Sequence, residues 1–305
     1  MSWDFELVAG PYGGVTEGPI WDGSGLLFTH IPSSRVLKYD EVRGSVSEFL
    51  TDTYNANGLM LDSNGVLHAC QGGARRVVRY EIDGSVTVLA SGFEGSRLNI
   101  PNDLAIHRDG SIWFTDPYYE GAAGPWSEDR ANKDLDHDSV YRIDSQRGRW
   151  ALTRLTFDTT RPNGILFSLD YSVLYVAQSG RLPDEKRELR AYPVLGDMRL
   201  GAYDVLHDFG EHRGIDGMVL DTNGNIIATA GFEQSGPGPM IYVFSSEGVV
   251  METHPMLVDR PTNCSFGGTN LSTLYVTTIN GHLFRTDTNR QGRLLYPALS
   301  KDQKQ

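Results

Sequence analysis

The hydrophobic residues of this chain come in short runs separated by polar turns, and one stretch shows the pattern clearly. "IPNDLAIHRDGSIWFTDP", residues 100–117, opens on a polar Pro-Asn-Asp sequence, continues through an apolar run, breaks at Asp109-Gly110 and resumes as a second β-favouring run. Elsewhere the apolar runs are likewise broken by Asp-Gly, Asn-Gly or Ser-Gly. Such runs and breaks are typical of many short strands joined by turns. The pattern therefore predicts an all-β protein.

The first half of this stretch recurs along the chain. Six segments share it: "EGPIWD" from Glu17, "NGLMLD" from Asn57, "NDLAIH" from Asn102, "NGILFS" from Asn163, "DGMVLD" from Asp216 and "NCSFGG" from Asn263. Their first residues are 40, 45, 61, 53 and 47 positions apart. Each segment begins with a side chain that carries an oxygen, and three further strand-like runs follow each one. In the third repeat these runs are "SIWFT", "SVYRID" and "WALTRL".

Six repeats of four strands predict a six-bladed β-propeller with four antiparallel strands per blade, formed by residues 1–305 as a single domain. A blade buries both of its faces only between two neighbours, and closing the ring leaves no open end. In the last repeat, "GRLLYP" is expected to be the fourth strand. "FELVAG" near the N-terminus is a further strand, expected to pair with the last blade and close the ring. Two stacked β domains are the main alternative, because 305 residues are many for one ordinary core.

A propeller places the first strand of each blade nearest the central axis. The repeated polar residues would then form a ring at one mouth of the channel, called the collar below: Glu17, Asn57, Asn102, Asn163, Asp216 and Asn263. Each of them, taken alone, is explained as a turn residue, because Asn and Asp side chains bond nearby backbone. Their recurrence in all six repeats, and Glu17 above all, favours a function for the ring.

Converging oxygens that include two carboxylates are suited to a hard cation. Calcium takes six to eight oxygen ligands, and carboxamides and water complete the shell. Zinc prefers His or Cys, and no His occupies the collar. The collar thus predicts a divalent cation site on the axis.

The long loops between second and third strands should lie on the same face as the collar. The longest covers residues 116–139 and is expected to supply a substrate pocket with aromatic walls, among them Tyr118, Tyr119 and Trp126. Asp116 ends a second strand on that face and is either a pocket residue or the Asp of a plain Asp-Pro turn. Asp103 is expected to be a turn residue that supports its neighbours.

Composition narrows the function further. Asp and Glu number 39 against 27 Lys and Arg, a net charge of −12 that argues against nucleic acid. The two cysteines, Cys70 and Cys264, show neither a disulfide framework nor zinc spacing and are expected to be buried. The N-terminal residues show no basic region followed by an apolar run, as a signal peptide would, so we expect a cytoplasmic protein. No apolar stretch of 18 residues occurs, so we expect no membrane span.

At these residues the chain resembles the gluconolactonase family, which includes the senescence-marker protein regucalcin. The resemblance covers essentially the whole chain and rests on five motifs in order: "TEGPIWD", "LNIPNDLAIHRDGSIWFTDP", "RPNGILFS", "GIDGMVLD" and "PTNCSFGG". It implies a six-bladed propeller with a divalent metal on its axis, usually calcium. It also implies hydrolysis of sugar lactones and other lactones.

The resemblance assigns roles residue by residue. Glu17 matches the glutamate ligand, Asn163 the asparagine ligand, and Asp216 the aspartate that both binds metal and transfers a proton. Asn102 matches the asparagine near metal and substrate. Ile100 stands where the animal members have an arginine that holds the sugar, so a less polar lactone is an alternative to an aldonolactone.

The sequence therefore predicts a metal-dependent lactonase with Asp216 as general base, while Asn57 and Asn263 line the pocket. The expected cofactor is one divalent ion, Ca²⁺ before Fe²⁺, Mn²⁺ or Zn²⁺, and the expected partner is a small-molecule lactone. A non-catalytic calcium- or sugar-binding propeller stays open, because propellers host many functions. Organophosphate hydrolysis at the same site, known among relatives of the family, stays open too.

Overall fold

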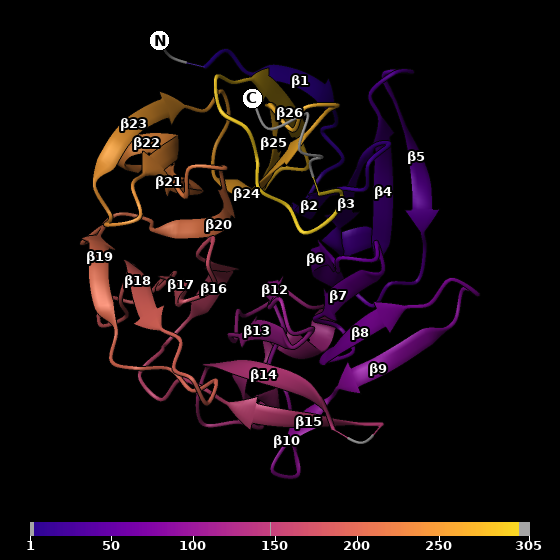
Figure 1. Cartoon of the computed structure of the whole chain (residues 1–305), viewed down its shortest axis with the longest axis vertical. Helices are drawn as coiled ribbons and strands as arrows, with labels where there is room; N and C mark the ends of the chain where they lie inside the picture. The colour runs from indigo at the N-terminus through magenta and orange to yellow at the C-terminus, as the bar shows by residue number, and fades with distance from the viewer. Residues whose placement is uncertain (1–2, 147, 299–305) are drawn as a thin grey trace.

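Six four-stranded antiparallel sheets surround a central axis in the computed structural model, which describes residues 3–146 and 148–298. Figure 1 looks down this axis and shows the sheets as blades of a ring, with the chain running round it once. The predicted six-bladed β-propeller with four antiparallel strands per blade is confirmed.

Each blade runs from an inner strand at the axis to an outer strand at the rim. Blades 1 to 3 are β2 (Thr16–Trp21), β3 (Leu26–His30), β4 (Arg35–Asp40), β5 (Ser45–Leu50); β6 (Ala56–Leu61), β7 (Leu67–Gln71), β8 (Arg76–Tyr80), β9 (Val86–Ala90); β12 (Leu104–Ile106), β13 (Ile112–Asp116), β14 (Ser139–Gln146), β15 (Arg149–Arg154). Blades 4 to 6 are β16 (Pro162–Phe167), β17 (Val173–Gln178), β18 (Glu188–Pro193), β19 (Asp204–Asp208); β20 (Ile215–Leu220), β21 (Ile226–Phe232), β22 (Ser235–Phe244), β23 (Val250–Pro255); β24 (Pro261–Gly267), β25 (Thr273–Thr278), β26 (Leu283–Asp287) and β1 (Glu6–Ala9).

Smaller elements lie between the blades. A hairpin of β10 (Gly92–Phe93) and β11 (Ser96–Arg97) precedes blade 3. Short 3₁₀ turns are η1 (Ile31–Ser33), η2 (Pro125–Glu128) and η3 (Arg130–Asn132), and the last two lie in the long loop between β13 and β14. Among the described residues, helices long and apolar enough to cross a membrane are absent.

The N-terminal strand closes the ring, as the sequence predicts. β1 pairs antiparallel with β26, so blade 6 is built from the two ends of the chain (Figure 1). Arg285 on β26 donates to Glu6 on β1 at 3.0 Å. At the inner edge, the Thr16 hydroxyl donates to the carbonyls of Thr278 (3.1 Å) and His282 (2.9 Å). The N-terminal strand therefore completes blade 6 at the rim, and Thr16 joins the first blade to the last near the axis.

The prediction that "GRLLYP" forms the fourth strand of the last blade is wrong. Residues 292–297 are not a strand, because β1 already occupies the outer edge of that sheet. The segment instead crosses the end of the axial channel, where the Arg293 amide donates to the Leu220 carbonyl at 2.9 Å. Leu294 is buried in the hydrophobic core. Because blade 6 has no free edge for residues 292–297 to join, this segment covers the end of the channel instead.

The inner strands have an irregularity where the polar residues stand. Five of them shift register there: between Glu17 and Ile20 in β2, and at the matching places of β6, β16, β20 and β24. A β-bulge bends a strand and redirects a side chain, and bulges are frequent beside functional sites. The repeated polar residue is therefore built into a bulge that turns it away from the regular pleat.

The glycines that follow the collar residues allow neighbouring inner strands to approach closely. A Cβ on Gly18 would lie 2.3 Å from the Asn57 carbonyl oxygen, and one on Gly164 would lie 2.5 Å from that of Asp216. Gly58 donates its amide to the Asn102 carbonyl across the blade boundary at 2.8 Å. Threonine hydroxyls bond other carbonyls of the ring, such as Thr115 to Asn163 at 2.8 Å. Contacts between blades therefore fix the backbone of the collar.

Candidate active site

The structure places all six collar residues at the start of the inner strands, and it brings several of their side chains together. Glu17, Asn102, Asn163 and Asn263 are buried, while Asn57 and Asp216 are partly exposed. The Glu17 carboxylate is hydrogen-bonded to the Asn263 side chain, and the Asp216 carboxylate to the Asn163 side chain. Two pairs, each of a carboxylate and a carboxamide, therefore face the channel mouth.

The carboxylates of the channel act on one another. Burial, and then the charges of Asp216 and Asp103, raise the pKa of Glu17 well above its ordinary value. Burial also raises the pKa of Asp103 to about 7, and it raises the pKa of Asp216 against the opposing charges of Arg213 and Arg181. Three carboxyl groups within electrostatic reach are costly to ionise together without a cation.

Asp103 has a larger part in this channel than the sequence suggested. Its Oδ1 accepts the amide of Leu104 at 2.9 Å, as expected of a turn residue. The same carboxyl group is hydrogen-bonded to the Asn263 side chain from blade 6. Asp103 stands where four of the other five repeats have glycine, and its carboxylate lies against Gly58, where an added Cβ would be 2.7 Å from Asp103 Oδ1.

Two arginines that the sequence reasoning missed lie beside Asp216. Arg213 donates from Nη2 to Asp216 Oδ2 at 2.5 Å and also to the carbonyl of Pro261 at 3.2 Å. Arg181, in the loop between β17 and β18, stacks its guanidinium 4.5 Å from the centre of the Tyr119 ring. The sequence offers little to identify these two arginines as site residues. Arg213 stands three residues before Asp216, and Arg181 lies in a long loop on the collar face.

Tyr119 is the aromatic residue of the long loop that reaches the collar. Its phenol oxygen accepts the Asn163 side-chain amide at 3.3 Å. Burial, followed by the Asp216 charge, raises the pKa of Tyr119 well above its ordinary value, so the phenol stays protonated. The hydroxyl donates its one hydrogen to the Ser179 carbonyl at 3.4 Å, a long hydrogen bond that a polar ligand would have to replace.

The other predicted pocket residues of this loop lie inside it. Tyr118 has no exposed surface, and its hydroxyl bonds the carbonyls of Ser127 and Asp129. Trp126 packs edge-on against Tyr118 and lies under the Arg75 guanidinium. Asp116 is also fully buried, and its Oδ2 accepts the amide of Asn99 at 2.8 Å. Direct contact of Asp116 or Tyr118 with a substrate would require the loop to move.

The donor atoms of the collar fit a hard cation. In residues 3–146 and 148–298, no three His, Cys, Asp or Glu side chains are grouped closely enough to hold a metal by themselves. Carboxamide oxygens would have to complete the shell, as they do for calcium. Asn57 Oδ1 is such an oxygen, buried with no hydrogen-bond partner. The all-oxygen donor set is suited to Ca²⁺ rather than to zinc.

Comparisons with known proteins agree with this architecture. Residues 15–280 match the family described as SMP-30/Gluconolactonase/LRE-like region. A gluconolactonase of Zymomonas mobilis is 28% identical over 277 residues, which cover 83% of this chain and 73% of that protein. Regucalcin of Macaca fascicularis is 25% identical over 268 residues, or 86% and 82% of the two chains. A gluconolactonase structure from Xanthomonas campestris superimposes with a TM-score of 0.79 at 28% identity, covering 93% of this chain and 89% of that one.

Proposed function

Because the chain belongs to the SMP-30/gluconolactonase/LRE-like family, we propose that it hydrolyses a lactone at the channel mouth surrounded by the collar. One observation carries the proposal. Two carboxylates from different blades, the buried Glu17 and the partly exposed Asp216, converge beside carboxamides and below long loops. Turn chemistry alone does not require two carboxylates to lie next to one another.

The residues that would hold a divalent cation are Glu17, Asn163 and Asp216, with Asn102 in or near the shell. Such a cation, Ca²⁺ in the first place, would polarise the lactone carbonyl as a Lewis acid and stabilise the negative charge that develops on it. Fe²⁺, Mn²⁺ and Zn²⁺ are the alternatives that metal replacement should compare.

Asp216 is the proposed general base. Its carboxylate takes a proton from the water that attacks the lactone carbonyl, and Arg213 orients it through Oδ2. Burial raises the pKa of Asp216 above that of an ordinary carboxylate although Arg213 opposes the rise, and a reactive ester such as a lactone needs no stronger base. Tyr119 and Asn163 offer a hydroxyl and a carboxamide to the lactone on the loop side. Asn57, Asn102 and Asn263 line the remainder of the mouth.

The substrate is proposed to be gluconolactone or a less polar lactone. Ile100 is almost fully buried, packed with Tyr118 and Ala123 in a small apolar cluster. The position that resembles the sugar-holding arginine of animal members therefore offers no donor for sugar hydroxyls. We expect aliphatic lactones to compete well with gluconolactone as substrates.

A non-catalytic binding protein is the second candidate, and the Arg213–Asp216 ion pair favours it, because a paired carboxylate is a poorer base. A lactone panel separates the two. Gluconolactone, δ-valerolactone and γ-butyrolactone would be assayed by acid release after chelation and after adding back each metal. Hydrolysis of none of them under any metal would contradict the proposed function, and calcium binding without turnover would favour the second candidate.

A further inference from the structure

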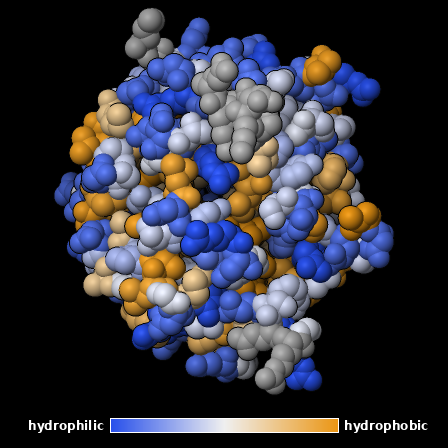
Figure 2. All heavy atoms as spheres, in the orientation of Figure 1, coloured by the Kyte–Doolittle hydropathy of each residue, from blue (hydrophilic) through white to orange (hydrophobic). Residues whose placement is uncertain are grey.

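The axial channel contains a cavity on the other side of the collar from the long loops. It has a volume of about 110 Å³ and is lined by inner strands of all six blades and by residues 293–295. Its walls are mainly apolar, with Ile20, Met60, Leu104, Phe167 and Met218 from the first five blades and Ser265 from the sixth. Figure 2 shows a hollow near the centre of this face, bordered by hydrophobic and hydrophilic residues.

One charged side chain reaches this cavity from the C-terminal segment. Arg293 lines it, and its guanidinium donates from Nη1 to the carbonyl of Leu294 at 3.0 Å. Arg290, three residues earlier, pairs with both Asp221 and Glu252. Arg293 makes no such ion pair within residues 3–146 and 148–298. A guanidinium has five N–H donors, so most of those of Arg293 remain available to a ligand.

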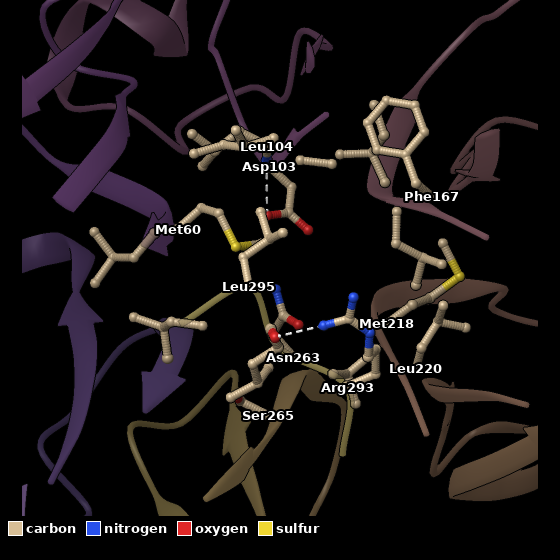
Figure 3. Close-up of a pocket in the computed structure, with 18 of the residues that line it drawn as sticks. Met60, Asp103, Leu104, Phe167, Met218, Leu220, Asn263, Ser265, Arg293 and Leu295 are labelled. Atoms are coloured by element: carbon tan, nitrogen blue, oxygen red, sulfur yellow. Dashed lines mark hydrogen bonds between the residues drawn. The ribbon is translucent and has the colours of Figure 1, made fainter. Parts of the chain in front are cut away.

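The polar side chains at the inner end of the cavity already have hydrogen-bond partners within the protein. Asp103 and Asn263 are hydrogen-bonded to each other there, and Figure 3 shows both side chains pointing toward the axis. Asp103 also accepts the Leu104 amide. The polar group without a charge partner is therefore the Arg293 guanidinium at the outer end, and the wall between the two ends is apolar.

We propose that this cavity binds a small aliphatic carboxylate, with its carboxylate on Arg293 and its chain along Met60, Leu104 and Met218. The planar guanidinium matches a carboxylate through two parallel hydrogen bonds. A cavity of this size holds a chain of roughly four to six carbons, by comparison with an engineered protein cavity of about 150 Å³ that binds benzene. A single arginine suits a monoanion better than a phosphate dianion. The site is separate from the proposed lactone reaction and does not depend on it.

The test is calorimetric titration of hexanoate into the full-length protein in the presence of EDTA, with 1-hexanol as the uncharged partner. Chelation removes any divalent cation at the collar, which would itself bind a carboxylate. We expect one hexanoate per chain and markedly weaker binding of 1-hexanol. Arg293→Gln should weaken hexanoate binding by about tenfold or more, the usual worth of a hydrogen bond to a charged group. Arg199→Gln is the matched control, because that arginine is exposed, lies away from the cavity and pairs with its neighbour Asp197.

A second variant tests the location of the chain. Met60→Trp should fill the cavity and abolish binding, and thermal unfolding would verify that it folds. Should it not fold, Arg293→Gln still decides, because that side chain is exposed and contributes little to the core. The proposal is overturned if the parent protein does not bind hexanoate, if Arg293→Gln binds it equally well, or if 1-hexanol binds as tightly. Lactone turnover is not measured in this experiment, so its failure would leave the proposed function untouched.

Discussion

Arg213 and Asp216 form an ion pair of 2.5 Å between residues three positions apart at the start of blade 5. The arginine is held from the other side by the Pro261 carbonyl of blade 6. The residue proposed as metal ligand and base thus has one of its two oxygens, Oδ2, engaged by a protein cation. The affinity of the collar for a divalent ion and the basicity of Asp216 should both depend on this contact.

Replacing Arg213 with Gln should tighten divalent-cation binding severalfold, because a positive charge beside a proposed ligand is removed. The effect is moderated by solvent, since both side chains of the pair are partly exposed. Turnover at saturating metal should fall, because Asp216 loses the contact that orients it. Calcium titration by calorimetry and kcat at saturating calcium measure the two effects. Weaker calcium binding in the variant would instead show that Arg213 positions Asp216 as a ligand.

Glu17→Gln and Asp216→Asn should differ in whether added metal restores lactone turnover. Each keeps the shape of the side chain and removes one negative charge, so both should weaken metal binding. With saturating metal, Glu17→Gln should recover much of its rate, whereas Asp216→Asn should remain low by roughly a hundredfold. Lactone turnover across a metal titration of both variants makes the comparison. Recovery of Asp216→Asn to near the parent rate would mean that Asp216 is a ligand only and that the base lies elsewhere.

Chelation should abolish lactone hydrolysis while the fold persists. The hydrophobic clusters lie between blades and are independent of the collar, unlike the core of a small zinc domain, which needs its metal to fold. Far-ultraviolet circular dichroism and activity would be recorded on the same EDTA-treated sample, with calcium re-addition as the control. Loss of the β-sheet spectrum on chelation would contradict this expectation.

Gly164→Ala should destabilise the protein and impair the site together. Its Cβ would lie 2.5 Å from the Asp216 carbonyl oxygen, so the backbone of blade 4 or blade 5 must shift. Overpacking of this kind costs about 1–3 kcal/mol. Gly196→Ala is the matched control, because nothing lies within 4 Å of its Cβ. Urea unfolding of both variants measures the free energies, and equal stabilities would show that the neighbouring blades tolerate the added methyl group.

The propeller and its collar could be predicted from the sequence because they are repeated. The polar residue and the apolar run recur once per blade, with a glycine between them in four of the six, and a repeated pattern reports the environment that all blades share. Glu17, Asn163 and Asp216 could be placed on one ring for this reason, although they lie far apart in the chain, and their roles stay a prediction. The pairing of "FELVAG" with the last blade followed from the need of a ring to close.

Features that occur only once were decided by the tertiary structure. "GRLLYP" has the composition of a strand, but the sheet edge it would join is taken by β1, and this is visible only when both ends of the chain are placed. Tyr118 and Tyr119 are adjacent aromatics in one loop, and the fold buries the first within the loop and brings the second to Asn163. Arg181 and Asp103 acquire their roles from charges on other blades, and Arg213 is held beside Asp216 by the Pro261 carbonyl of blade 6. Distances between residues remote in sequence set those electrostatic effects, and local patterns carry no record of them.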